Sequence, residues 1–211
     1  MNIVDTNAQK TSLKAQIEAL PDDSVLFRSD FPEYHPEFVG SVLAELTYTG
    51  VLYKLAQGIY AKPRTSRFGP VLPSVEKVVR AIAVRDNAQV LPSGMTALNV
   101  LGLSTQVPMS HTYLTTGSER IVKMVNCQVV LKRGVPKNFC YKTRLVALLV
   151  QALKKLKKEN VGDTELQIIR ELVSKEADKN SLVRDVEMMP DWMRSIIKPM
   201  LNNTEYEQIV D

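Results

Sequence analysis

Hydrophobic side chains in the first third of the chain recur at helical spacing in two places. The first helix is predicted to begin at Thr11 or Ser12, to end before Pro21 and to bury Leu13, Ile17 and Leu20. A second helix is predicted over 36–49, because Gly50 is a favoured stop and the apolar positions form a continuous stripe. That stripe consists of Phe38, Val39, Val42, Leu43 and Leu46.

Short β-rich segments surround the second helix. A strand over 25–27 and a helical turn that Ser29 caps and that runs to Tyr34 are predicted before it. Two β-rich runs over 51–55 and 59–63, joined by a turn at Gly58, predict a hairpin after it. This order of elements is typical of a winged helix-turn-helix, in which the hairpin is the wing and the 36–49 helix is the recognition helix.

The rest of the chain predicts a mixed α+β domain. Segment 64–73 is rich in proline, glycine and arginine and predicts a linker, so the winged helix-turn-helix is assigned to 1–68 and the second domain to 69–211. Its predicted strands lie at 89–91, 111–115, 121–124 and 128–132, the last two as a hairpin. Helices are expected from Ser74, over 92–102, over 142–158 and from an Asp163 cap, followed by a helical tail from about 161 that Pro190 and Pro199 interrupt. The fold class is therefore α+β.

Charge is distributed unevenly along the chain. The net charge of +4 arises from −1 over 1–70, +10 over 71–160 and −5 over 161–211, and segment 120–158 holds eleven Lys or Arg and no Asp or Glu. Such a segment attracts a polyanion or an acidic protein surface. The alternative is that the acidic tail folds back over it.

The candidate contacts to double-stranded DNA lie on the second helix, on the wing and just after the wing. They are Ser41, Tyr48, Lys54, Gln57, Lys62, Arg64 and Arg67. The helix itself carries Glu37 and Glu45 and no Lys or Arg. Four phosphate contacts correspond to a log–log salt slope of roughly −3.6, so tight binding requires a homodimer or the second domain. The candidate basic surface of that domain comprises Lys132, Arg133, Lys137, Lys142 and Arg144.

Signals for metal binding, catalysis and membranes are weak. Cys127, Cys140, His35 and His111 show no paired ligand spacing, so no metal or cofactor is expected. Thr116-Gly117-Ser118 resembles the start of a nucleotidyltransferase loop, but the carboxylates of that chemistry are absent from 120–158, and a hairpin turn is predicted instead. The polar start of the chain and its short apolar runs predict a cytoplasmic protein. Because neither histidine lies beside a recognisable nucleophile motif, the protein is not expected to be an enzyme.

Three segments resemble a known family. Gly50–Tyr60, Leu91–Pro108 and Tyr113–Gly117 are similar to the AbiE-type antitoxins of bacterial type IV toxin–antitoxin (abortive infection) systems, over about residues 20–158. The most distinctive part is the block Pro92-Ser93-Gly94, Ala97-Leu98-Asn99 and Leu101-Gly102-Leu103. The resemblance implies a winged helix that represses its own operon. It also implies a second domain that counteracts a nucleotidyltransferase-like toxin, without implying direct contact.

Two other functions stay open at the level of sequence. The winged helix and the basic surface suit a protein-interaction module that holds an acidic partner. An enzyme whose site is assembled from residues far apart in sequence is the third hypothesis.

Overall fold

The computed structural model describes the backbone of residues 3–206 and the side chains of residues 7–201. The chain forms two compact units, the first over 1–85 and 122–127 and the second over 86–121 and 128–211. The expected boundary at residue 68 lies inside the first unit. Helix α3 (Val75–Arg85) belongs to this unit, since Lys77 Nζ lies 2.6 Å from Asp23 Oδ2 and the Arg85 guanidinium lies 4.4 Å from the centre of the Phe27 ring.

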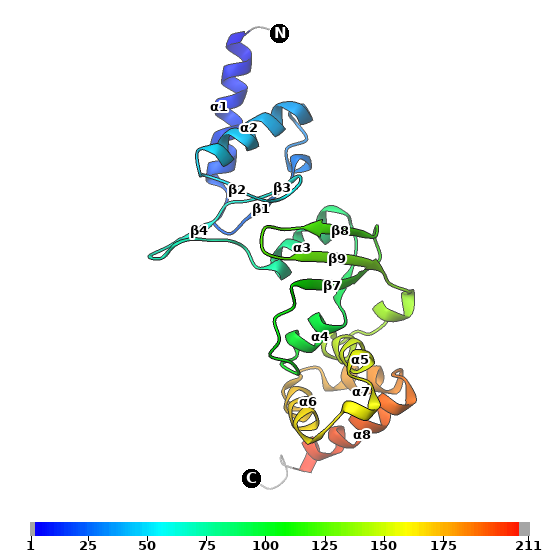
Figure 1. The fold of residues 1–211 in the computed structure, drawn as a ribbon. Coiled ribbons are helices and arrows are strands. Elements are labelled where there is room, and N and C mark those ends of the chain that lie inside the picture. The colour runs from blue at the N-terminus through cyan, green and yellow to red at the C-terminus, as the bar shows by residue number, and fades with distance from the viewer. Residues whose placement is uncertain (1–2, 207–211) are drawn as a thin grey trace. The chain divides into compact units, whose positions relative to one another are not determined.

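The first unit begins with two helices and a small antiparallel sheet (Figure 1). In chain order its elements are α1 (Ile3–Ala19), β1 (Val25–Leu26), the 3-10 turn η1 (Arg28–Asp30), α2 (Pro36–Tyr48), β2 (Tyr53–Ala56) and β3 (Ile59–Ala61). The sheet has the order β1-β3-β2, with Val25 opposite Ala61 and Lys54 opposite Tyr60. The predicted second helix and the predicted hairpin over 51–63 are thereby confirmed.

The core of this part forms where α1 and α2 meet the hairpin. Leu13 and Ile17 of α1 are fully buried, as expected from their spacing. They pack with Val39, Val42, Leu43, Leu46, Leu52 and Tyr60. The apolar stripe of α2 thus faces inward, which leaves its other face outside this core.

Two predicted helix starts are wrong. Helix α1 begins before Thr11, whose hydroxyl donates to the Asn7 carbonyl one turn earlier and so does not cap. The turn η1 is not capped by Ser29 and ends before Tyr34; instead the Asp30 carboxylate accepts from the Phe27 N–H at 2.9 Å. A carboxylate three residues after a helix start binds orphan N–H groups there, and this local pairing sets the turn.

The predicted linker is also wrong, because it forms a two-stranded ribbon. Strands β4 (Arg64–Ser66) and β5 (Gly69–Val71) pair only with each other, with Thr65 opposite Pro70. Proline is tolerated because both strands are edges. The ribbon leads into α3, where the Ser74 hydroxyl accepts from the Lys77 N–H as predicted.

The second unit is a mixed α+β structure built on a four-stranded sheet of order β6-β7-β9-β8. Its strands are β6 (Val90–Pro92), β7 (Ser110–Thr115), β8 (Arg120–Lys123) and β9 (Gln128–Arg133), and the tip of the β8–β9 connection groups with the first unit. β6 pairs antiparallel with β7, whereas β7 and β9 are parallel, with Ser110 opposite Gln128. Since β9 lies between β7 and β8, Thr116-Gly117-Ser118 joins strands that are not neighbours, and the predicted hairpin turn there is wrong.

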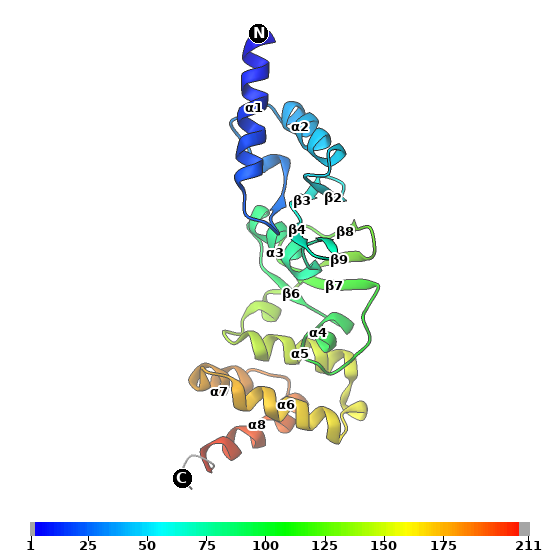
Figure 2. The same cartoon turned by 90° about the vertical axis from the view of Figure 1, so that its left-hand side faces the viewer.

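Helices cover this sheet in two layers (Figure 2). The layer next to the sheet holds α4 (Met95–Val100) and α5 (Arg144–Leu156), and the outer layer holds α6 (Asp163–Lys175), α7 (Lys179–Glu187) and α8 (Asp191–Tyr206). The 3-10 turns η2 (Pro136–Phe139) and η3 (Lys158–Asn160) flank α5. Residues Val146–Leu153 of α5 are all buried, because this helix lies between the sheet and the tail.

Two details of the tail differ from the sequence-based prediction. Gly162 rather than Asp163 precedes α6, and its N–H donates to the Glu165 carboxylate at 3.0 Å. Pro199 lies inside α8 instead of ending it. Ile197 and Met200 on either side of this proline are buried. The favourable free energy of burying these side chains offsets the cost of the backbone hydrogen bond that proline removes.

Among the described residues, no helix has the length and apolar character that crossing a membrane requires.

Candidate nucleic-acid interface

The outward face of α2 carries small and polar side chains. Glu37, Ser41, Ala44 and Tyr48 are exposed at helical spacing, and the Tyr48 side chain is 93% exposed. The Ser41 hydroxyl donates to the Phe38 carbonyl at 2.8 Å. That hydroxyl retains acceptor capacity toward an incoming donor. This face therefore offers hydrogen bonding and one aromatic ring but no cation of its own.

Glu45 is neutralised by α1. Lys10 Nζ lies 2.8 Å from its Oε2 and Lys14 Nζ lies 2.7 Å from its Oε1. Hydrogen bonds from Lys10 and then Lys14 hold the pKa of the Glu45 carboxyl below its ordinary value. One of the two acidic residues that oppose phosphate binding by α2 is thus paired within the unit.

Arg28 brings a guanidinium to α2, and the sequence analysis missed it. A Cβ at Gly40 would lie 3.0 Å from Arg28 Cζ and 3.1 Å from its Nε, so the side chain rests against the helix where glycine leaves room. Arg28 is exposed. The signal was a glycine in a helix interior, which costs stability and often marks a close approach.

Lys54 and Gln57 are exposed on the β2–β3 hairpin, beside a tight turn. Gly58 has φ +72°, which an L side chain rarely adopts. The tight turn brings Gln57 close in sequence and space to the strand that carries Lys54. These two candidates therefore share one hairpin.

Lys62 has a structural role. Its Nζ donates to the carbonyls of Glu18 and Leu20, each at 2.6 Å, and lies 3.7 Å from Asp22 Oδ1. A cation at the last carbonyls of a helix satisfies their unpaired acceptors and complements the helix dipole. We therefore remove Lys62 from the set of candidate DNA contacts.

Arg64 and Arg67 are exposed on the β4–β5 ribbon. The Arg67 guanidinium carbon lies 4.7 Å from the centre of the Phe68 ring. Residues 46–75 contain four basic side chains and no Asp or Glu. The hairpin and the ribbon thus form a continuous stretch of positive charge next to α2 in sequence.

The basic residues of the second unit lie along one stretch of chain. Lys132 and Arg133 end β9, Lys137 lies in η2, and Lys142 and Arg144 lie at the start of α5; all five are exposed.

The acidic tail does fold back near the start of α5. The buried Asp185 carboxylate accepts from the Thr143 N–H at 2.6 Å and from the Thr143 hydroxyl. Nearby, the Ser181 N–H lowers the pKa of Asp178, with a smaller effect from Lys142. The tail therefore faces the start of α5, while the side chains of Lys132, Arg133 and Lys137 remain exposed.

The distinctive 92–103 block has structural roles in the second unit. The Thr96 hydroxyl accepts from the Thr112 N–H at 2.9 Å, and the Ser93 hydroxyl donates to the buried Gln151 side chain at 3.3 Å. Gly94, with φ +59°, caps α4. The block thereby joins β7, α4 and α5.

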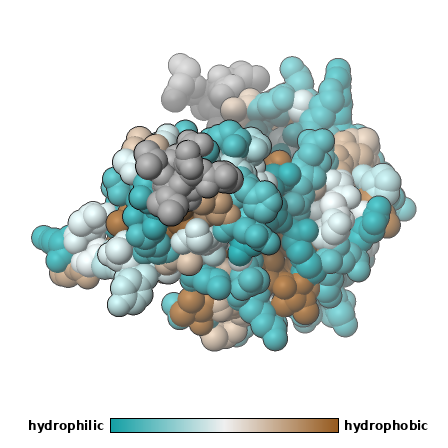
Figure 3. All heavy atoms as spheres, turned by 90° about the horizontal axis from the view of Figure 1, so that it is seen from above, coloured by the Kyte–Doolittle hydropathy of each residue, from teal (hydrophilic) through white to brown (hydrophobic). Residues whose placement is uncertain are grey.

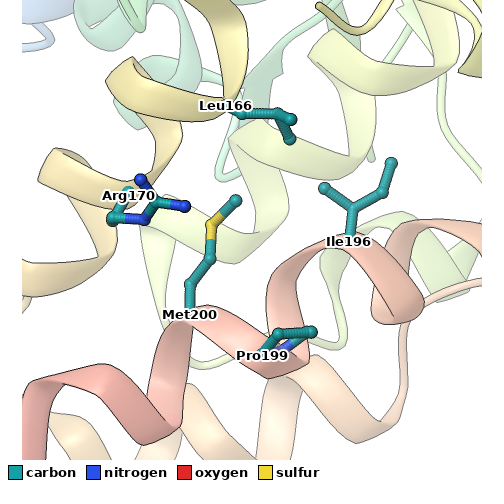
Figure 4. Close-up of a pocket in the computed structure, with 5 residues that line it drawn as sticks. All are labelled: Leu166, Arg170, Ile196, Pro199 and Met200. Carbon is teal, nitrogen blue, oxygen red and sulfur yellow. The ribbon is translucent and has the colours of Figure 1, made fainter. Parts of the chain in front are cut away.

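A groove of about 360 Å³ lies between α6 and α8 (Figure 4). Leu166 and Arg170 line it from α6, and Ile196, Pro199 and Met200 line it from α8. Figure 4 shows the Met200 side chain extending between the two helices.

No group of three or more His, Cys, Asp or Glu that could hold a metal ion lies among the residues the structure describes. Burial lowers the pKa of His111 and raises that of Cys127, which makes the neutral form of both side chains the favoured one near pH 7.

Comparisons with known proteins place the chain in a family without naming an activity. No curated protein matches it. It is similar to the crystal structure of the RV2827C protein from Mycobacterium tuberculosis, with 17% identity over 92% of this chain and 75% of that chain and a TM-score of 0.49. Residues 12–181 match a family of unknown function, DUF6088. The match covers most of the chain, so this protein belongs to the DUF6088 family.

Proposed function

We propose that the first unit is a winged helix-turn-helix that binds double-stranded DNA and represses its own operon. The observation that carries the proposal is the acid-free stretch 46–75, which begins in the last turn of α2, a helix whose outward face lies outside the core. The order α1, β1, η1, α2, β2, β3 and the sheet order β1-β3-β2 support it. In this proposal α2 enters the major groove, Arg28, Lys54 and Arg64 bind phosphates, and Arg67 adds a fourth positive charge beside the DNA backbone.

Charge reversal tests this proposal on the DNA upstream of the protein's own reading frame. Lys54→Glu together with Arg64→Glu should abolish the retardation of that DNA in a gel at low salt, because both phosphate contacts become repulsive. Lys154→Glu with Lys155→Glu is the matched control: it changes the formal charge equally, at two exposed residues in the last turn of α5. Undiminished retardation by the first variant would exclude binding through the wing.

The second unit is proposed to be the antitoxin part, which counteracts a nucleotidyltransferase-like toxin. Support comes from the resemblance of segments 91–108 and 113–117 to AbiE-type antitoxins. The test is co-expression with a nucleotidyltransferase-like protein encoded beside it. Restored growth supports the proposal, and lethality that persists at equal expression contradicts it.

One observation favours a different function, in which α2 contacts a protein in place of DNA and the basic surface meets the acidic side chains of that partner. The outward face of α2 has no Lys or Arg of its own, and Tyr48 stands fully outside the core. Against it, the hydrophobic spheres on the face that Figure 3 shows lie in small separate groups, whereas protein-binding sites usually expose a larger apolar area. Co-purification of a neighbouring gene product, with no retardation of DNA at low salt, would favour the protein partner.

A further inference from the structure

The β4–β5 ribbon ends in an apex of two residues, Arg67 and Phe68. Ser66 and Gly69 pair on either side of them, and Gly69 has φ +107°, a value that favours glycine. The Ser66 hydroxyl accepts from the Phe68 N–H at 3.2 Å and donates to the Gly69 carbonyl at 2.7 Å. The backbone of the apex is therefore fixed by its own hydrogen bonds.

The two side chains of the apex are stacked and outside any core. The Phe68 side chain is 87% exposed, and the Arg67 guanidinium carbon lies 4.7 Å from its ring centre. Stacking on a ring limits the conformations of the arginine, which lowers the entropic cost of binding a ligand. The exposed phenylalanine leaves the stacked arginine accessible to a ligand.

Groove width limits how much of this apex can enter the minor groove. A ribbon of two strands with its side chains is too broad for the minor groove, which is about 6 Å wide, but a single guanidinium enters it. Narrow A·T-rich minor grooves have an enhanced negative potential that attracts arginine. The absence of Asp and Glu from residues 46–75 means that no carboxylate of this segment opposes that attraction.

We propose that Arg67, held by Phe68, inserts into the minor groove beside the DNA segment that the first unit binds, and that it favours A·T base pairs there. This inference rests on the proposed DNA binding and adds a second, shape-dependent contact to it. The ribbon then selects among sites that α2 and the β2–β3 hairpin bind equally well.

Modified base pairs separate minor-groove from major-groove contact. The probes are versions of the upstream DNA whose flanking base pairs are A·T, G·C or inosine·cytosine; the last pair resembles A·T in the minor groove and G·C in the major groove. Wild-type protein should bind the A·T and inosine versions equally and the G·C version about fivefold more weakly. An inosine version bound like the G·C version would overturn the inference, because the ribbon would then contact the major groove.

Variants assign the preference to the apex. Arg67→Ala should remove the preference, Phe68→Ala should reduce it, and Phe68→Tyr should retain it because the ring remains. Arg80→Ala is the matched control, since it removes one exposed arginine elsewhere in the same unit. Equal effects of Arg67→Ala and Arg80→Ala would refute the inference alone, whereas failure of the wild-type protein to bind any of these duplexes would refute the proposed function as well.

Discussion

At the scale of single residues, Gly40 and Arg28 show how a side chain far along the sequence reaches the candidate interface. Glycine in a helix interior costs about 1 kcal/mol relative to alanine. Here it leaves space that the Arg28 guanidinium occupies, at 3.0–3.2 Å from the position of an added Cβ. The cost in helix stability is thus associated with a cation next to the outward face of α2.

Replacing Gly40 tests how firmly the Arg28 side chain is held against α2. Gly40→Ala should stabilise the protein by about 0.5–1 kcal/mol, because the added methyl group displaces only the end of a flexible, exposed side chain. Urea unfolding followed by circular dichroism measures this change. A lower stability in the variant would mean that Arg28 is held rigidly against the helix.

Asp185 is a buried carboxylate, and its hydrogen bonds give it a structural role, although buried carboxylates often belong to active sites. Asp185→Ala should lower the free energy of unfolding of the second unit by about 2–4 kcal/mol, because the buried N–H and hydroxyl of Thr143 lose their acceptor. Urea unfolding followed by Trp192 fluorescence reports on this unit, since Trp192 is the single tryptophan. Glu171→Ala, at an exposed ion pair with Lys175, should change stability by less than about 0.5 kcal/mol. Similar values for the two variants would contradict the capping role of Asp185.

At the scale of elements, the sequence predicted the helices and strands that a short stretch of hydrophobic spacing or a turn residue is enough to define. The stripe Phe38 to Leu46 and the Gly58 turn identify α2 and the β2–β3 hairpin, because spacing and turn residues suffice to define them. The β4–β5 ribbon was missed because Gly69 and Pro70 suit a linker equally well. The parallel pairing of β7 with β9 was missed because it joins segments that no short-range pattern connects.

The candidate site was predicted only in part, for a similar reason. Exposure of Lys54 and Gln57 follows from polar residues on a short hairpin, and exposure of Arg64 and Arg67 was expected from the polar segment that the sequence analysis assigned to a linker. The binding of Lys62 to the end of α1 and the approach of Arg28 to α2 depend on tertiary packing, which neither composition nor spacing reveals.

The contact between α1 and α2 predicts a dependence of stability on pH. The pKa of Glu45 is lowered by Lys10 and Lys14, so the folded state gains stability above the ordinary value of 4.5 and loses it as pH falls through the lowered pKa. Glu45→Gln should therefore be less stable than wild type at pH 7, and the two should converge as pH falls through the lowered pKa of Glu45. Thermal unfolding followed by circular dichroism at low salt measures the difference, which should shrink at high salt. A constant difference across this range would show that the ion pairs add nothing.

At the scale of the whole molecule, positive charge lies in both units, and 11 of the 23 Asp and Glu residues lie in the tail after residue 160. The first unit carries its cations on the hairpin, the ribbon and Arg28, and the second carries exposed Lys132, Arg133 and Lys137. The tail packs on α5 and caps it through Asp185, so this acidic residue of the tail serves the fold of the second unit. The exposed cations that follow α2 are why we propose DNA binding for the first unit, whereas the proposed antitoxin role of the second unit rests on the resemblance of segments 91–108 and 113–117.

The salt dependence of DNA binding tests this assignment most directly. Contacts by Arg28, Lys54, Arg64 and Arg67 give a log–log slope of about −3.6 for the wild-type protein, or steeper if the second unit contributes. Lys54→Ala with Arg64→Ala should reduce the slope by about 1.8, because two phosphate contacts are lost. Fluorescence anisotropy with the upstream duplex at several salt concentrations gives both slopes. Equal slopes for the wild-type protein and the double variant would contradict the account.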